Sequence, residues 1–90
     1  MNIIQLTSII KEKIEKNIVT ESILIEDKTF LHQKHKSHQE GRFHLKVTIK
    51  SKELKEINKI ESNKKIYKIL TEEIKKYIHS IQILIIYLSS

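Results

Sequence analysis

Histidine is the residue type in this sequence that is best suited to chemistry. The 90 residues include five histidines and no cysteine, and four of the five lie between positions 32 and 44. Imidazole nitrogen is a good ligand for zinc, copper and iron, and the three-residue spacing of His32, His35 and His38 could bring them to a common ion. The alternative is a solvated polar loop in which histidine is tolerated. Because the stretch offers neither cysteine nor a rigid ligand geometry, this alternative is favoured over an autonomous zinc site.

The other two histidines are expected at better-defined positions. His79 is predicted at the junction between a long helix and the last strand, where packed elements on both sides would fix it. On the residues alone, a histidine there is more often a helix C-terminal residue that interacts favourably with the helix macrodipole. His44 begins an alternating segment and is expected to be structural.

The lysines of this sequence suggest a second function, which is binding to nucleic acid. Residues 50–68 contain seven lysines and three glutamates, a local charge of +4 out of the chain's +6. The phosphate contacts would come from Lys52, Lys55, Lys59, Lys64 and Lys65. The sequence has no GxxG loop, almost no arginine for bidentate base reading and no aromatic ladder for stacking. A lysine-rich solvated surface is therefore the competing interpretation of this region.

The sequence offers little that an enzyme could use. It contains no nucleophile elbow, P-loop, dinucleotide fingerprint or HExxH helix, and a single glycine cannot build a phosphate cradle. The adjacent acids Glu72 and Glu73 diverge by about 100° on a helix and are expected to form a solvated face. The prediction is a protein without enzymatic activity.

Length and composition limit the classes of protein that these residues can form. Ninety residues fit one domain, taken as residues 1–90, and 39% hydrophobic with 31% charged residues is typical of a soluble globular chain. Any sulfur ligand must come from a partner, because the chain has no cysteine. The N-terminal stretch lacks the features of a signal peptide, and the last apolar run is far shorter than the roughly 20 residues that cross a bilayer. A cytoplasmic protein without a membrane partner is expected.

A stripe of isoleucines marks the first predicted helix. Thr7 or Ser8 can cap it, and Ile10, Ile14 and Ile18 follow at four-residue spacing. Lysine and glutamate occupy most of the other positions. The spacing predicts a helix that buries one stripe against a core.

Two predicted strands and a loop follow this helix. Residues 21–27 are rich in β-branched side chains and predict the first strand. Residues 28–42 lose the pattern and contain three histidines and the only glycine of the chain, so they predict a loop. Residues 44–50 alternate between apolar and polar side chains, which is typical of a half-buried strand.

The second half of the sequence predicts two helices and a final strand. Residues 52–63 predict a short helix, and a longer one runs from Ser62 to Ile78. The buried stripe of the longer helix consists of Ile66, Leu70, Ile74 and Ile78. The apolar run 81–88 predicts a strand at the centre of the sheet, flanked on both edges, because buried strands form continuous apolar runs. The predicted fold class is α+β, a single domain in the order α-β-β-α-α-β, with a three-stranded mixed sheet and two main helices on one face.

The predicted element order and four short motifs resemble the BolA family, whose fold is a three-stranded sheet packed by helices and is related to class II KH domains. The residues that carry the resemblance are Asp27-Lys28-Thr29 with His32, Phe43-His44-Leu45-Lys46-Val47, Ile66-Tyr67 and Ile78-His79-Ser80-Ile81. They match the family's acidic-x-Ser/Thr stretch, its His-Phe-Lys-Val strand opening, its Val-Tyr pair and its closing His-Ala-Leu. The two departures are Leu54-Lys55-Glu56 in place of Phe-x-Gly and Ser62-Asn63 in place of Arg-His.

The resemblance implies a role in handling iron-sulfur clusters. Family members that bind a cluster with a monothiol glutaredoxin use the histidine of the closing motif and a His or Cys from the loop between the first two strands. Those roles would fall on His79 and His32, with His35 and His38 as substitutes and His44 as a structural residue or a hydrogen-bonding neighbour of the ligands. The implied [2Fe-2S] cluster would be shared with glutaredoxin and glutathione, and the isolated chain, a monomer or weak dimer, would bind none. The family also includes proposed transcriptional regulators, so DNA binding through the lysine-rich region is the alternative.

Overall fold

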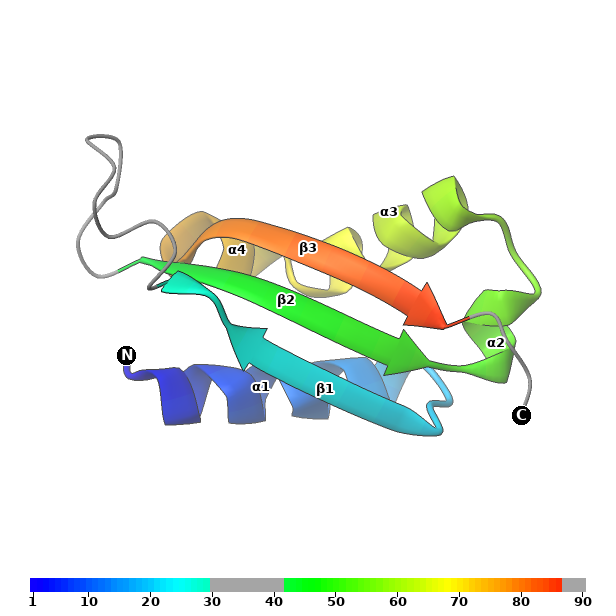
Figure 1. Ribbon diagram of the computed structural model, residues 1–90, viewed down its shortest axis with the longest axis horizontal. Coiled ribbons are helices and arrows are strands. Elements are labelled where there is room, and N and C mark those ends of the chain that lie inside the picture. Colours follow the sequence, from blue (N-terminus) through cyan, green and yellow to red (C-terminus); the bar gives the residue numbers. More distant parts are fainter. Residues whose placement is uncertain (30–41, 87–90) are drawn as a thin grey trace.

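The computed structural model describes residues 1–29 and 42–86 as a layer of helices packed on a three-stranded sheet (Figure 1). The elements are α1 (Ile3–Asn17), β1 (Ser22–Asp27), β2 (Phe43–Lys50), α2 (Lys52–Lys55), α3 (Lys59–Ile69), α4 (Thr71–Lys76) and β3 (Ile78–Ile86). The predicted α+β class and α-β-β-α-α-β order are confirmed, with α3 and α4 in the place of the longer predicted helix. No helix in the described ranges is long and apolar enough to cross a membrane.

Helix α1 begins earlier than the sequence analysis predicts. Its N-cap is Asn2, whose Oδ1 accepts a hydrogen bond from the Gln5 N–H at 2.8 Å, while the Gln5 side chain accepts one from the Asn2 N–H at 3.3 Å. This reciprocal capping box satisfies two backbone donors, so the caps predicted at Thr7 and Ser8 are wrong. The predicted isoleucine stripe is nevertheless buried, and the earlier start adds Leu6 to it.

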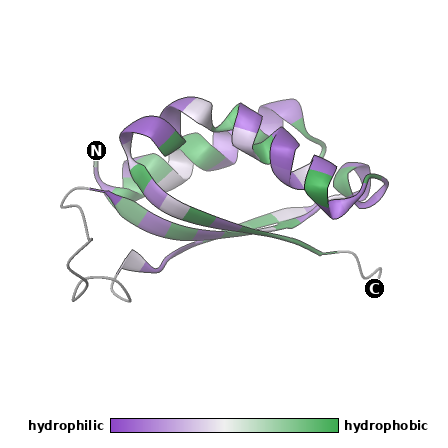
Figure 2. Cartoon of the chain, turned by 90° about the horizontal axis from the view of Figure 1, so that it is seen from above, coloured by the Kyte–Doolittle hydropathy of each residue, from purple (hydrophilic) through white to green (hydrophobic). Residues whose placement is uncertain are grey.

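The helices all lie on one face of the sheet, as predicted (Figure 2). The core forms where this layer meets the sheet, and Leu45, Val47 and Ile49 of β2 belong to the same buried cluster as side chains of α1 and α3. Alternate residues of a strand point to opposite faces, so the remaining side chains of β2 point away from the helices. We call this second side the open face. Its side chains are those of Ser22, Leu24, Glu26, His44, Lys46, Thr48, Lys50, Ser80, Gln82, Leu84 and Ile86.

Strand β2 lies at the centre of the sheet. It pairs with β1 in antiparallel and with β3 in parallel orientation, which gives the order β1-β2-β3. The prediction of a central final strand is therefore wrong, because β3 pairs with β2 alone among the described strands. A parallel pair needs a long crossover, and α2, α3 and α4 carry the chain back to the end of the sheet where β2 began (Figure 1).

The apolar run in β3 arises because both faces of the strand carry apolar side chains, and it does not indicate a central place in the sheet. Ile83 and Ile85 are buried against the helices, whereas Leu84 between them lies on the open face and is 44% exposed. Leu84 pairs with Thr48 of β2, which pairs in turn with Leu24 of β1, itself 56% exposed. The exposed Leu84 thus gives β3 the sequence pattern of a strand that is covered on both sides.

The segment between β2 and β3 folds as three helices. Helix α2 is a single turn capped by the Ser51 hydroxyl, which accepts a hydrogen bond from the Leu54 N–H at 3.2 Å. Helix α3 starts after Asn58, whose side chain caps it. The longer predicted helix is interrupted at Leu70, whose backbone angles (φ −100°, ψ 17°) depart from helical values, and α4 ends at Lys76.

The two departures from the BolA pattern lie at the junction of α2 and α3. Ser62 is fully buried, and its hydroxyl donates to the Leu54 carbonyl at 3.1 Å. Glu56 is exposed and forms the C-cap of α2. The small serine therefore has a structural role here, since it ties the start of α3 to the end of α2.

Candidate functional site

Two histidines that are far apart in the sequence meet at one end of the sheet. His44 is the second residue of β2 and His79 is the second residue of β3, and their ring centroids are 4.8 Å apart with the planes tilted by 52°. The rings meet because parallel strands begin at the same end of a sheet. His79 lies inside the strand, after α4 has ended at Lys76, so the interpretation of His79 as a helix C-terminal residue is wrong.

The imidazole of His44 is held from the neighbouring strand. Its Nδ1 lies 2.7 Å from Ser80 Oγ, and the residue is 5% exposed although it belongs to the open face. His44 and Ser80 are partners in the β2–β3 register, so their hydrogen bond follows directly from the strand pairing. The bond fixes the orientation of a buried ring whose polar atoms would be costly to leave unsatisfied.

The backbone of His44 is fixed by the end of β1. Its N–H donates to Thr29 Oγ1 at 3.1 Å, and its carbonyl accepts from the Lys28 N–H at 2.7 Å. The Thr29 N–H donates to Asp27 Oδ1 at 2.9 Å, and the Thr29 hydroxyl donates to the same carboxylate oxygen. This turn gives the Asp27-Lys28-Thr29 motif a physical role, since it places the start of β2.

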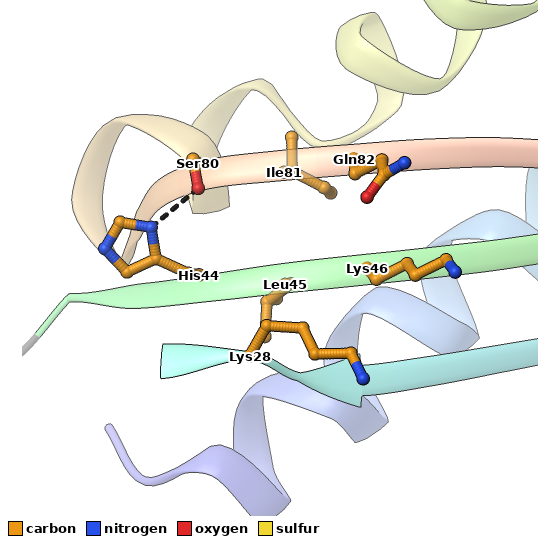
Figure 3. A pocket seen from close by; sticks show the side chains of 7 residues that line it. All are labelled: Lys28, His44, Leu45, Lys46, Ser80, Ile81 and Gln82. Carbon is orange, nitrogen blue, oxygen red and sulfur yellow. Dashed lines mark hydrogen bonds between the residues drawn. The ribbon is translucent and has the colours of Figure 1, made fainter. Parts of the chain in front are cut away.

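A pocket of about 340 Å³ opens beside His44 (Figure 3). It is lined by Lys28, His44, Leu45, Lys46, Ser80, Ile81 and Gln82. Lys28 directly follows β1, and the other lining residues belong to β2 and β3. The lining therefore carries two ammonium groups, a hydroxyl and an amide, and it contains no carboxylate.

The loop histidines predicted as ligands lie outside the described residues. His32, His35 and His38 fall in the segment 30–41, so their approach to His79 remains a prediction. Within residues 1–29 and 42–86, no group of three or more histidine, cysteine, aspartate or glutamate side chains could hold a metal ion. The described part of the site thus brings together two imidazoles, those of His44 and His79.

The lysines predicted to contact nucleic acid lie on α2 and α3, and α2 stands at the opposite end of the sheet from the start of β3 (Figure 1). All five are exposed, namely Lys52, Lys55, Lys59, Lys64 and Lys65. Lys65 Nζ lies 2.6 Å from Glu53 Oε2. Lys64 Nζ lies 3.9 Å from Glu61 Oε1. The other three lysines form no ion pair with a described residue, so they are the ones best placed to contact phosphate.

Glu53 joins α2 to two other parts of the helix layer. Besides the ion pair with Lys65, its Oε1 accepts a hydrogen bond from the Val19 N–H at 3.4 Å. These hydrogen bonds, first from Lys65 and then from Val19, hold the pKa of the Glu53 carboxyl below 4.5. The carboxylate therefore stabilises the folded chain in its ionised form.

Glu73 is buried, so the solvated face predicted for it is wrong, although Glu72 is exposed as predicted. Glu73 Oε2 accepts a hydrogen bond from Lys13 Nζ at 2.7 Å, which links α4 to α1. This bond raises the pKa of the Lys13 ammonium group above 10.5. The pair is a structural tie between two helices, and it lies apart from the pocket.

The chain folds as a small α+β domain in which helices cover one face of a mixed three-stranded sheet. Two histidines meet at one end of that sheet. Residues 14–86 match the family described as BolA-like protein. The chain belongs to the BolA-like family.

Comparisons with individual proteins agree with this assignment. The chain is 33% identical over 73 residues to the DNA-binding transcriptional regulator BolA of Haemophilus influenzae, which covers 81% of this chain and 68% of that protein. Its fold is similar to that of BolA1 from Arabidopsis thaliana, with a TM-score of 0.74, 27% identity and coverage of 87% of this chain and 86% of that one. The BolA domain of SufE1 from Arabidopsis thaliana has the same fold, with a TM-score of 0.73, 24% identity and the same coverage of both chains.

Among the polar residues of the pocket, the sequence predicts a site role for His44 but none for Lys28, Lys46, Ser80 or Gln82. Ser80 belongs to the Ile78-His79-Ser80-Ile81 motif, in which only His79 was given a role. The contact with His44 depends on the parallel register of β2 and β3, which places Ser80 opposite His44. Recognising it from the sequence would have required the register of β2 and β3, which local sequence patterns do not give.

Proposed function

We propose that this chain is a non-enzymatic partner of a monothiol glutaredoxin and holds a [2Fe-2S] cluster jointly with that protein and with glutathione. His79 is one ligand and a loop histidine, His32, is the second, with His35 and His38 as substitutes. His44 orients His79 without binding iron itself. The isolated chain binds no cluster and is a monomer or a weak dimer.

The observation that carries this proposal is the contact between His44 and His79. His79 is exposed, and its ring lies against that of His44, which is buried and bonded to Ser80. Contact with a fixed neighbour restricts the rotation of an exposed imidazole, which would lower the entropy lost if that imidazole bound a metal. Since the chain has no cysteine, the sulfur ligands would come from glutaredoxin and glutathione. Membership of the BolA-like family supports the choice of partner.

The direct test is to mix the purified chain with a cluster-loaded monothiol glutaredoxin and to record visible absorption and EPR spectra. Histidine in place of thiolate leaves a cluster less negative and raises its potential, as in Rieske centres, so both spectra should shift. Because only neutral imidazole binds metal, the shift should diminish as the solution is acidified.

Variants assign the ligands. His79→Ala should abolish the spectral shift and leave the circular dichroism of the chain unchanged, because His79 is exposed. His32→Ala should weaken the shift, or leave it intact if His35 or His38 takes over. Lys76→Ala, an exposed change at the end of α4, is the control and should have no effect. If His79→Ala gave the same heterodimer and the same spectrum as the parent chain, the ligand assignment would be wrong.

The second candidate function is DNA binding through α2 and α3. The name of the Haemophilus influenzae relative describes DNA binding, and Lys52, Lys55 and Lys59 are exposed and form no ion pair with a described residue. Contacts of lysine with phosphate carry no sequence information. Binding through these residues is therefore expected to be weak, salt-sensitive and nearly independent of sequence.

Titration with duplex DNA at low and physiological salt tests this candidate. Replacing Lys52, Lys55 and Lys59 together by alanine should lower the slope of log affinity against log salt by roughly 3, since each phosphate contact contributes about 0.9. The control removes the same charge from α1 and α4 by replacing Lys11, Lys75 and Lys76, and it should change the slope less. Nanomolar affinity at physiological salt with strong sequence discrimination would place DNA binding ahead of cluster binding.

A further inference from the structure

The pocket beside His44 has the chemistry of an anion site. Its volume of about 340 Å³ lies within the range of small-molecule pockets, roughly 300 to 1,000 Å³. Figure 3 shows the Lys28 and Lys46 side chains reaching along the open face, with Ser80 and Gln82 on the neighbouring strand. The two lysines and Gln82 offer hydrogen-bond donors, the Ser80 hydroxyl is bonded to His44 Nδ1, and none of the lining residues is acidic.

The local charge also favours an anion. Lys28 forms an ion pair of 3.0 Å with Glu26, and both side chains are about one-third exposed, so water competes for this pair. Lys46 lies opposite Glu26 in the β1–β2 register but forms no ion pair with any described residue. Two ammonium groups thus face one carboxylate, which leaves a net positive charge at the pocket.

The pocket adjoins the histidine that would bind the cluster. His44 lines the pocket, and its ring lies 4.8 Å from that of His79, centroid to centroid. In the proposed complex, the small molecule bound next to His79 is glutathione, which carries two carboxylates and two peptide groups. An extended tripeptide spans on the order of 10 Å, so its sulfur can bind the cluster while a carboxylate reaches the pocket.

We propose that the pocket formed by Lys28, Lys46, Ser80 and Gln82 binds a carboxylate of the glutathione whose thiolate is a ligand of the cluster. This inference rests on the proposed function for the position of the tripeptide. The pocket of this chain would then bind a carboxylate of glutathione, while the cluster binds its sulfur. A carboxylate of an acidic side chain on the partner has the same chemistry, and the experiment separates the two sources.

The experiment uses the isolated chain without a cluster. Reduced glutathione is titrated into the isotopically labelled chain, and amide chemical shifts are followed by NMR. The diethyl ester of glutathione, which lacks free carboxylates, and acetate are titrated in parallel. With glutathione, the shifts should be concentrated at Lys28, His44 to Lys46 and Ser80 to Gln82.

Matched variants identify the charge that binds. Lys46→Ala should weaken glutathione binding about tenfold, the loss expected for one charge-assisted hydrogen bond. Lys68→Ala removes the same charge from an exposed position on α3, in the helix layer on the other side of the sheet. This control should leave the affinity within about twofold of the parent value, because salt screens exposed charges that are distant from the ligand.

Each contrary result has a distinct meaning. Equal binding of glutathione and its diester would overturn the proposal, because the carboxylate would not be recognised. Equal binding of acetate would reduce the pocket to a general anion site and overturn the assignment to glutathione. If glutathione did not bind but Lys46→Ala weakened the complex with glutaredoxin, the carboxylate would belong to the partner and this proposal would be wrong.

The glutathione titration and the cluster spectra of His79→Ala together separate this proposal from the proposed function. If His79→Ala left the shared cluster unchanged, the cluster function would fail even if glutathione bound the isolated chain through Lys46. If the cluster complex depended on His79 but glutathione did not bind the isolated chain, the pocket proposal would fail and the cluster function would stand.

Discussion

The two faces of the sheet are built from alternate residues of the same strands, yet they differ in what they contribute. On the covered face, Leu45, Val47 and Ile49 are buried in the cluster shared with the helices. On the open face, the neighbouring residues Lys46 and Thr48 are only half-buried. The covered face therefore determines stability, and the open face is under fewer packing demands and can carry the polar groups that a site requires.

The open face itself changes along the strands. Near the start of β2, His44 is buried like a core residue and is bonded to Ser80 and Thr29. Further along, Leu24 and Leu84 are apolar and exposed. His44 is thus a buried, hydrogen-bonded residue on a face whose other named side chains are exposed or half-buried, and the candidate site lies around it.

The largest expected effect comes from comparing adjacent residues of β3 that lie on opposite faces. Ile85→Ala should lower the free energy of unfolding by about 2 to 5 kcal/mol, because it removes a side chain that is 5% exposed from the core. Leu84→Ala deletes the same number of carbon atoms from the open face and should cost less than about 1 kcal/mol. Urea denaturation measures both values. Similar losses for the two variants would show that the open face is also packed against something.

A smaller effect is expected at the buried histidine of the open face. Ser80→Ala removes the hydroxyl bonded to His44 Nδ1 and should lower the free energy of unfolding by about 0.5 to 1.5 kcal/mol. It should also change the nitrogen chemical shifts of the His44 ring, which NMR can follow. Ser22→Ala, an exposed change on β1, is the control. Unchanged ring shifts in Ser80→Ala would mean that the hydroxyl does not fix the imidazole.

The smallest effect is expected on the outer side of the helix layer and depends on pH. The pKa of Glu53 is lowered below 4.5, so the stability it contributes is fully present above about pH 4.5 and is lost as the pH falls through the folded-state pKa. Glu53→Gln should therefore destabilise the chain at neutral pH and make less difference in strong acid. Thermal unfolding between pH 2 and 7 measures this dependence. Glu56→Gln is the control, because Glu56 is exposed and forms no ion pair with a described residue. This variant should keep the loss of thermal stability that the parent chain shows on acidification. An equal reduction of that loss in Glu56→Gln and Glu53→Gln would contradict the role given to Glu53.

Much of the fold could be predicted because periodicity reports which side chains are buried. The four-residue spacing of Ile10, Ile14 and Ile18 identified the buried stripe of α1, and the alternation in residues 44–50 identified β2. The cap at Asn2 was missed because Thr7 was an equally acceptable capping residue closer to the stripe. Local patterns therefore located the elements better than their ends.

Strand order could not be predicted in the same way. An apolar run indicates that both faces of a strand carry apolar side chains, and Leu84 supplies them on the open face without any covering layer. The family resemblance drew attention to His44 and His79, but the contact between their rings depends on the parallel register. Ser80 was missed for the same reason, since its importance lies in the residue that it faces across the sheet.

Parallel pairing makes the histidine site a product of complete folding. His44 and Ser80 are 36 residues apart in the sequence, and the three helices α2, α3 and α4 lie between them. Closing so long a loop costs conformational entropy before the contacts can offset it, and long-range strand pairing is slow. A partly folded chain in which α1, β1 and β2 have formed but β3 has not docked would have neither the paired rings nor the pocket. The site is therefore complete only when β3 has docked against β2.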